Sequence, residues 1–303
     1  MRTAALSSEL EKIPGLRVRT GVELARLTTF KVGGPAAVLA TPETAESLQA
    51  LQKIVGDSGT PLFILGNGSN VLVADEGFDG VVVRIGSALG GIEVAAPDRI
   101  RIGAGTLWSK VLRFAGKEGW TGFEFGAGIP GTLGGACATN AGTRGGETAD
   151  RLLEVVGVDA AGEIRALRAA DLGFRYRGCD LPDGFIVTGT LFSAERGDPA
   201  RIEETVRGYQ AERRRDQPER EPSAGCIFKN PKGASAGKLI DLAGLKGERE
   251  GAAVVSPVHG NFIINTGGAT AVDVLKLIDR VRERVLAAHG VTIELEIRKM
   301  GFA

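Results

Sequence analysis

The stretch GFEFGAGIPGTLGGACATNAGTRGGE, from Gly122 to Glu147, decides how this chain can fold. Glycine inside a helix or strand costs roughly 0.5–1 kcal/mol relative to alanine, so this density of glycine indicates a backbone used for its own geometry. Two interpretations remain open from these glycines. They form tight turns between strands, or they let bare N–H groups approach an anionic ligand such as a phosphate.

A second glycine loop favours the ligand interpretation. The apolar run Leu62–Leu65 precedes GNGSN, from Gly66 to Asn70, and the apolar run Val71–Val73 follows it. This pattern predicts a strand, a tight loop and a strand. A two-residue Asn-Gly hairpin explains part of it without any ligand. The loop lacks the Lys-Ser/Thr ending of a P-loop and opens no helix, so it is not a Rossmann fingerprint either.

The composition is not that of a nucleic-acid-binding, disulfide-rich or metal-binding protein. The 303 residues include 37 basic and 37 acidic side chains, so nothing indicates a nucleic-acid-binding surface. The 3 cysteines and 2 histidines have no spacing typical of a disulfide framework or a metal site, and we expect no metal. Because no apolar leader or membrane-length run is present, we expect a cytoplasmic protein with no membrane contact and no required protein partner.

Local patterns predict an α+β fold. Helices are expected at Leu6–Ile13, from Thr41 to about Val55, and at Ser109–Glu118, 200–215, Ala236–Ala243 and 271–288. Strands are expected at Val81–Ile85, Ile100–Gly103, Val155–Val158, Ile186–Thr190, Ala253–Ser256 and Phe262–Asn265. The helix at 271–288 is the best marked, with Thr270 and Asp273 as a capping box and Gly290 as its end. Its predicted apolar face is Leu275, Ile278, Val281 and Val285.

Two C-terminal segments contain residues suited to chemistry. SAGCIFKNP places Cys226 after a glycine, where a thiol can act as a proton donor or a nucleophile. By itself the segment fits a buried structural cysteine at least as well, because most free cysteines are of that kind. ELEIR, from Glu294 to Arg298, is typical of a solvated edge strand.

Together these motifs resemble the UDP-N-acetylenolpyruvoylglucosamine reductases (UDP-N-acetylmuramate dehydrogenases), flavoenzymes of bacterial peptidoglycan precursor synthesis. The resemblance runs from about Leu24 to Gly301, through TTFKVGGPA, LGNGSNVLV, GFEFGAGIPGTLGGACATNAG, FRYRGC, RRRDQP, SAGCIFKNP, AGKLIDLAGLKG, HGNFIIN and ELEIRKMG. It is a resemblance to the shorter type of this family, because the chain has no insertion of the kind that carries a substrate-binding tyrosine loop.

The resemblance implies a two-part FAD-binding module of the vanillyl-alcohol oxidase (PCMH) type and a C-terminal α+β substrate domain. We expect FAD-binding subdomains at 1–86 and 87–198, a substrate domain at 199–290, and a C-terminal strand within 291–303 that returns to the first subdomain. The resemblance also implies a non-covalent FAD whose pyrophosphate is cradled by backbone N–H groups. The expected FAD contacts are Gly66, Asn67, Gly68, Ser69, Asn70, Val71, Gly128, Ile129, Pro130, Gly131, Gly134, Gly135, Ala136, Asn140 and Gly142.

The implied reaction is the NADPH-dependent, FAD-mediated reduction of UDP-N-acetylglucosamine enolpyruvate to UDP-N-acetylmuramate. Arg177 is expected to bind the substrate carboxylate and the developing enolate. Cys226 is expected to donate a proton, and Glu296 matches the catalytic glutamate of the family. Substrate contacts are expected from Tyr176, Arg214, Lys229, Asn230 and Asn261. The chain departs from the family pattern at Cys179, where serine is common, and at Gly260, where alanine is usual.

Three side chains, Arg177, Cys226 and Glu296, are expected to converge on one cavity beside the flavin ring. Two other functions remain open. One is a different FAD oxidoreductase of the same superfold, many of which tether flavin covalently to histidine, although His259 and His289 are both remote from the glycine loops in sequence. The other is a non-catalytic UDP-sugar-binding protein, against which the retention of all three candidate catalytic residues argues.

Overall fold

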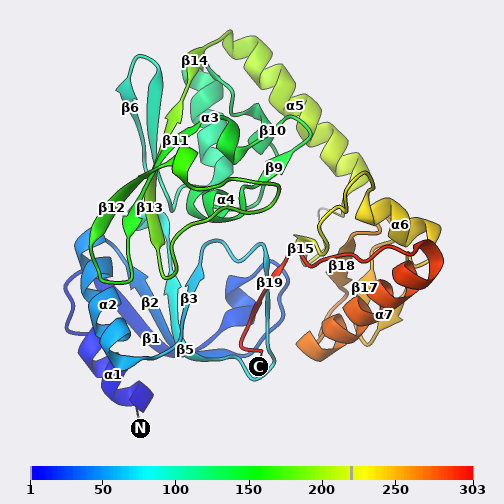
Figure 1. The fold of residues 1–303 in the computed structure, drawn as a ribbon, viewed down its shortest axis with the longest axis horizontal. Helices are drawn as coiled ribbons and strands as arrows, with labels where there is room; N and C mark the ends of the chain where they lie inside the picture. The colour runs from blue at the N-terminus through cyan, green and yellow to red at the C-terminus, as the bar shows by residue number, and fades with distance from the viewer. Residues whose placement is uncertain (1, 219–220, 303) are drawn as a thin grey trace. The chain divides into compact units, whose positions relative to one another are not determined.

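Helices separate runs of mostly short strands along the chain in the computed structural model (Figure 1). The structure describes residues 2–218 and 221–302. They divide into two compact units. The first contains the residues up to Thr20, Val38–Asn67 and Gly80–Glu212, and the second contains Gly21–Ala37, Gly68–Asp79 and the residues from Arg213 onward.

One sheet belongs mainly to the first unit, and helices pack against its apolar side chains. Its strand order is β1 (Leu16–Glu23), β2 (Pro35–Pro42), β5 (Phe78–Arg84) and β3 (Leu62–Leu65). The helices are α1 (Arg2–Leu10) and α2 (Ala45–Ser58), which contribute Leu10, Leu48 and Leu51 to the buried core. Helix α2 begins later than predicted, because Pro42 ends β2 and Thr44 is the N-cap in a capping box with Ser47.

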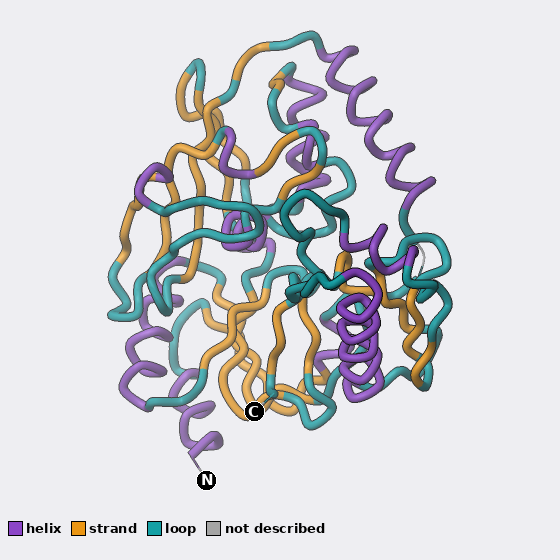
Figure 2. The backbone as a smooth tube through the Cα atoms, turned by 45° about the vertical axis from the view of Figure 1, so that its right-hand side comes forward, coloured by secondary structure: helices purple, strands orange, loops and turns teal. Residues whose placement is uncertain are grey.

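An antiparallel sheet and several helices form the rest of the first unit. Figure 2 draws the strands of the protein in orange and its helices in purple. Its strand order is β12 (Ile164–Arg168), β11 (Leu152–Val158), β13 (Ile186–Ser193), β7 (Arg99–Gly103) and β6 (Ile92–Ala96). Two small ribbons are β8 (Trp120–Thr121) with β14 (Glu195–Arg196), and β9 (Gly142–Thr143) with β10 (Gly146–Glu147). The helices are α3 (Trp108–Glu118), α4 (Leu133–Thr139) and most of α5 (Pro199–Asp216).

The second unit has a four-stranded sheet and two helices. The strand order is β15 (Ser223–Cys226), β18 (Phe262–Asn265), β17 (Ala253–Val255) and β16 (Arg249–Glu250). The helices are α6 (Ala236–Leu242) and α7 (Ala271–His289). A separate parallel pair joins β4 (Val71–Val73) to β19 (Arg298–Met300), with Val71 opposite Arg298.

Helix α7 confirms its predicted signals. Thr270 and Asp273 form the capping box, and Gly290 ends the helix in the left-handed conformation. The buried face is displaced slightly from the predicted one. Val274 and Leu277 are fully buried with Ile278, Val281 and Val285, whereas Leu275 is only partly buried.

Two sequence-based interpretations are wrong. The Asn-Gly hairpin does not form, because β3 pairs with β5 while β4 pairs with β19. The predicted edge strand Glu294–Arg298 is also absent. Leu295 makes an isolated bridge with Phe228, and regular pairing begins only at Arg298. The short helix α4, which lies inside the glycine run, carried no local helix signal and was missed.

The two compact units divide the chain differently from the expected domains, whose boundaries at residues 86 and 198 stay predictions. Residues 21–37 and 68–79 group with the C-terminal part of the chain, and most of α5 groups with the first unit. The C-terminal strand β19 pairs with β4, but both belong to the second unit. Within the described ranges, no helix is both long and apolar enough to cross a membrane.

Candidate active site

The two glycine loops contact each other within the first unit. The Asn67 Nδ2 donates a hydrogen bond of 2.6 Å to the carbonyl oxygen of Pro130. A Cβ atom on Gly66 would lie 2.7 Å from Thr132 Oγ1, so the two loops approach each other closely at this glycine. The run from Gly128 to Thr132 therefore lies beside the start of GNGSN and leads directly into α4.

Backbone donors are left unused in both loops. No residue in the described ranges accepts a hydrogen bond from the N–H groups of Gly66, Asn67, Gly68, Ser69 or Asn70. The same holds for the N–H groups of Gly128, Gly131 and Gly135. Unpaired N–H groups in consecutive turn residues are the usual way in which a backbone binds a phosphate. Each loop by itself therefore fits an anionic group such as a phosphate.

Two of the glycines are required by the protein's own packing. A Cβ on Gly68 would lie 2.2 Å from the carbonyl oxygen of Leu27, and Gly68 has a φ of 65°. A Cβ on Gly134 would lie 2.9 Å from Ala104 Cβ, and the N–H of Gly134 already donates to the Ala104 carbonyl. Substitutions at these positions would disturb the fold before they disturbed a ligand.

The remaining predicted FAD contacts have varied surroundings. Val71 and Ala136 are buried, on β4 and α4 respectively, and Ile129 is partly buried. Asn140 is the left-handed C-cap of α4, and Gly142 begins β9. These five assignments as FAD contacts stay predictions.

Arg177 lies in a tight turn of the first unit. Arg175 and Gly178 exchange backbone hydrogen bonds of 2.9 and 3.0 Å, and Arg177 has a left-handed φ of 55°. The guanidinium stacks over the ring of Tyr176 at 4.9 Å and donates through Nη2 to the Gly142 carbonyl at 2.9 Å. A non-glycine residue in this backbone conformation persists only where its surroundings hold it, and such residues cluster at functional sites.

Cys226 and Glu296 lie on adjacent segments of the second unit. The Glu296 N–H donates to the Ile227 carbonyl at 2.8 Å, and the Lys229 N–H donates to the Glu294 carbonyl at 2.8 Å. Cys226 ends β15 after a bulge, where Gly225 has a φ of 76°. Both Cys226 and Glu296 are partly exposed, unlike the fully buried Cys137. This favours a reactive position for Cys226 over a structural one.

Thr29 and Asn70 make hydrogen bonds that hold this part of the second unit together. The Thr29 N–H donates to the Gly68 carbonyl at 3.0 Å. The Thr29 Oγ1 donates to the carbonyl oxygen of Ser223, on β15, at 2.7 Å. The Asn70 Nδ2 donates to the Glu296 carbonyl at 3.3 Å. The motif TTFKVGGPA contained the signal for Thr29, but sequence alone assigned it no role.

Asn261 completes the sheet beside Cys226. Its Oδ1 accepts from the Phe228 N–H at 2.9 Å and its Nδ2 donates to the Phe228 carbonyl at 2.7 Å. The side chain thus imitates the backbone of a paired strand, and it is 3% exposed. This supports a positioning role for Asn261, whereas its expected contact with substrate stays a prediction.

The other predicted substrate contacts lie nearer the surface. Tyr176 is 45% exposed, and Arg214 is exposed on the last turn of α5. Lys229 Nζ lies 3.7 Å from Glu294 Oε2, a pairing that leaves the ammonium partly exposed. Asn230 Oδ1 accepts from the Ala236 N–H at 3.0 Å, where α6 begins.

Two family models match the chain over most of its length. An FAD binding domain matches residues 35–168, and the C-terminal domain of UDP-N-acetylenolpyruvoylglucosamine reductase matches residues 217–300. The reductase of Phenylobacterium zucineum is 44% identical over 280 residues, which are 92% of this chain and 93% of that protein. The chain belongs to the UDP-N-acetylenolpyruvoylglucosamine reductase (MurB) family.

A solved member of the family has the same fold. The crystal structure of the Thermus caldophilus MurB aligns with a TM-score of 0.83 at 41% identity, covering 94% of this chain and 99% of that one. A glucose dehydrogenase, Phl p 4.0202, aligns with a TM-score of 0.52 at 14% identity over 66% of this chain, which supports the fold alone. The predicted α+β class with an FAD-binding module of the PCMH type is confirmed.

Membership in the MurB family decides between the functions that the sequence left open. The chain is an FAD-dependent oxidoreductase that reduces UDP-N-acetylenolpyruvoylglucosamine in peptidoglycan precursor synthesis. The unused N–H groups of each glycine loop suit a phosphate group of FAD, and the assignment of these loops as FAD contacts stays a prediction. Of the candidate catalytic residues, Arg177 belongs to the first unit, and Cys226 and Glu296 to the second. The convergence of all three beside the flavin stays a prediction.

Proposed function

We propose that Arg177, Cys226 and Glu296 carry out the half of the family reaction in which substrate is reduced. The chemistry supplied by bound FAD is hydride transfer, with NADPH as the source of the hydride. Addition of hydride to the enolpyruvyl double bond builds negative charge beside the substrate carboxylate. The protein must therefore supply a fixed cation for that charge and an acid for the adjacent carbon.

Arg177 is the proposed cation. A guanidinium can bind a carboxylate through two parallel N–H···O bonds, and the same group stabilises an enolate that forms next to it. Its bond to the Gly142 carbonyl supports a fixed guanidinium, and its left-handed backbone supports a turn that its surroundings hold in place. The group is then in place before charge develops, and no reorganisation is needed during the reaction.

Cys226 is the proposed acid. An ordinary thiol has a pKa of about 8.5, so it is mostly protonated at neutral pH and can deliver a proton. The partial exposure of Cys226 at the end of β15 supports this role, since a substrate can reach the thiol there. Serine at the same position would donate from a hydroxyl of similar size.

Glu296 is proposed to orient this acid or the substrate. The observation that carries the proposal is the hydrogen bond between the Glu296 N–H and the Ile227 carbonyl, 2.8 Å long, which joins Glu296 to the residue after Cys226. The bond from Asn70 to the Glu296 carbonyl supports the same arrangement from the other side. A carboxyl group there is available to hold or relay a proton next to the thiol.

The UDP-sugar is the proposed small-molecule partner. Its contacts with basic residues of the protein are proposed from the negative charge of its diphosphate. We expect Arg214 and Lys229 to meet the anionic part of the substrate, with Tyr176, Asn230 and Asn261 nearby. The three free cysteines support a reducing compartment. The cytoplasm is therefore the proposed location, with no further protein partner required.

Separate measurement of the two half-reactions tests the role of Cys226. Cys226→Ala should leave the reduction of flavin by NADPH nearly unchanged. It should slow the reoxidation of flavin by the enolpyruvyl substrate by about 10²–10⁴-fold, the usual contribution of a positioned acid. Cys226→Ser should retain much of the rate. Equal losses in both half-reactions would show that Cys226 has a different role.

A further inference from the structure

The turn that carries Arg177 is attached to the C-terminal end of α4. This helix ends at Thr139, and Asn140 is its C-cap with a φ of 43°. The Asn140 Nδ2 donates to the Arg175 carbonyl at 3.0 Å, and its Oδ1 accepts from the Ala149 N–H at 3.0 Å. The side chain is completely buried. Both ends of the amide are therefore used, and its orientation is determined by these partners.

The other side of the turn is attached through Cys179. Its Sγ lies 3.5 Å from the carbonyl oxygen of Cys137 and 3.7 Å from that of Ala138. The Cys137 carbonyl also accepts from the N–H of the C-cap Asn140 at 3.2 Å, and a carbonyl oxygen has a second lone pair to which a thiol can donate weakly. The cysteine thus makes the contact for which a serine hydroxyl is equally suited. With the bond from Arg177 to Gly142, the turn has three links to residues 137–142.

We propose that Asn140 and Cys179 are positioning residues for Arg177, a role that rests on the function proposed above for that arginine. They hold the backbone of residues 175–179 against the end of α4. The left-handed conformation of Arg177 is unfavourable for a residue other than glycine, and its surroundings maintain it. If the neighbouring contacts are lost, Arg177 can adopt a more favourable backbone conformation. Loss of either link would displace the guanidinium without removing it.

An alternative role for Asn140 is direct contact with FAD, as the sequence analysis expected. The two roles predict different defects. A flavin ligand, when changed, should lower the amount of bound flavin and slow both half-reactions. A positioning residue should leave the flavin in place and slow only the step that uses Arg177. Both amide atoms of Asn140 already have protein partners, which favours the positioning role.

The substitution Asn140→Asp separates these roles. It keeps the size of the side chain and the acceptor for Ala149, but it replaces the donor to the Arg175 carbonyl with an oxygen. We expect bound FAD and the NADPH half-reaction to be within about twofold of the parent enzyme. Reoxidation by substrate should slow about 10- to 100-fold, the effect of a misplaced catalytic group.

Asn265→Asp is the matched control for a loss of stability. Asn265 is 5% exposed, donates through Nδ2 to the Phe30 and Lys31 carbonyls, and accepts at Oδ1 from the Gly267 and Ala269 N–H groups. Like Asn140→Asp, the control replaces a buried side-chain amide with a carboxyl group, but at a position that is far along the chain from Arg177. It should lower the unfolding temperature without a selective effect on reoxidation.

A double-mutant cycle identifies the residue through which Asn140 acts. In an Arg177→Ala background, where reoxidation is already slow, Asn140→Asp should add no further loss beyond about twofold. A multiplicative loss would overturn the positioning role. An Arg177→Ala enzyme with normal reoxidation would instead overturn the function proposed for Arg177 itself.

Variants at Cys179 provide a second test in case Asn140→Asp does not fold. Cys179→Ser retains a donor for the carbonyls of Cys137 and Ala138, and its reoxidation rate should match that of the parent. Cys179→Ala removes the donor and should slow reoxidation, with bound FAD unchanged. Equal rates for the alanine and serine variants, or loss of flavin from the alanine variant, would contradict the proposal.

Discussion

Individual glycines in the two loops have different tasks. At Gly68 and Gly134 a side chain would collide with Leu27 or Ala104, so glycine there is a condition of folding. At Gly135, on the exposed first turn of α4, a Cβ would meet only Thr132 Oγ1, at 3.6 Å. Its unused N–H makes Gly135 the residue at which ligand approach can be tested without disturbing the protein.

Gly135→Leu should fold at least as well as the parent, because leucine favours a helix more than glycine does. It should weaken FAD binding at least about tenfold, because the leucine side chain would keep the phosphate away from the backbone N–H and so prevent their hydrogen bond. Flavin absorbance per protein after gel filtration measures this. Gly116→Leu on α3, whose Cβ would have nothing within 4 Å, is the control and should keep its flavin. Full flavin content in Gly135→Leu would exclude this N–H from the FAD site.

At the scale of an element, the side chain of Asn261 extends the hydrogen bonding between β15 and β18. Asn261 bonds both backbone groups of Phe228, and its own N–H donates to His259 Nδ1 at 3.1 Å. That nitrogen must be unprotonated to accept the bond. The protonation of His259 is thus linked to the segment next to Cys226.

Burial, and then the charge of Lys246, lower the pKa of His259 in the folded protein. Asp216 acts in the opposite direction, and Arg213 adds to the lowering. Below about pH 6.5 the unfolded chain gains a proton on this histidine that the folded chain does not. The free energy of unfolding should therefore fall as the pH falls from about 6.5 towards the lowered pKa.

Urea unfolding at about pH 7.5 and about pH 5.5 measures this effect. His259→Asn retains an acceptor near the position of Nδ1 and cannot titrate, so it should lose less stability between the two pH values than the parent. An unchanged pH dependence in His259→Asn would show that this residue is not its source.

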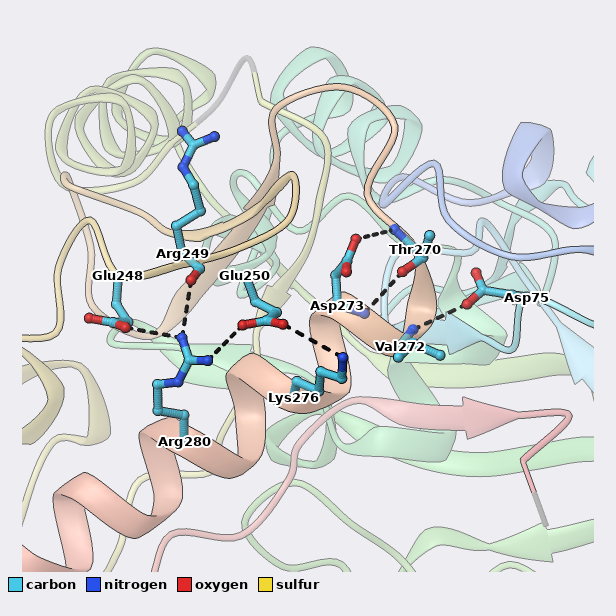
Figure 3. Close-up of polar contacts among 9 residues, drawn as sticks. All are labelled: Asp75, Glu248, Arg249, Glu250, Thr270, Val272, Asp273, Lys276 and Arg280. Carbon is cyan, nitrogen blue, oxygen red and sulfur yellow. Dashed lines mark hydrogen bonds and ion pairs between the residues drawn. The ribbon is translucent and has the colours of Figure 1, made fainter.

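At the scale of the whole molecule, distant segments assemble the second unit. Asp75, which follows β4, caps α7 from outside the helix. Its Oδ1 accepts from the Ala271 N–H at 2.7 Å. Its Oδ2 accepts from the Val272 N–H at 3.2 Å, the contact drawn in Figure 3. Further along α7, Arg280 bonds Glu248 and Glu250, and Lys276 pairs with Glu250. These contacts join α7 to chain segments before and after Cys226.

Asp75→Ala should lower the free energy of unfolding by about 1 kcal/mol, the usual cost of losing a helix cap. Asp279→Ala, at an exposed position on α7, is the control and should be neutral or slightly stabilising. Chemical denaturation of both variants, loaded with FAD, provides the comparison. If Asp75→Ala loses no more stability than Asp279→Ala, the cap contributes little.

Much of the fold was predictable because its signals are local. The capping box, apolar spacing and terminal glycine of α7 all lie within the helix or next to it. The sequence also predicted loops between apolar strands at Gly66–Asn70, and its ordered motifs predicted the family. Helix α4 was not predicted, because the two glycines in its first turn disfavour a helix. Its start is held instead by hydrogen bonds to the carbonyl oxygens of Ala104 and Thr106.

What the sequence by itself determined is therefore the family, the cofactor and most of the regular elements, because periodicity, capping and motif order are properties of neighbouring residues. Only the tertiary structure decided that β3 and β4 enter different sheets, that Glu296 lies beside Ile227, and that Asn140 holds the Arg177 turn. These are hydrogen bonds between residues that are remote in sequence. The identity of a residue specifies which bonds it can make, but only the folded chain specifies with which partner.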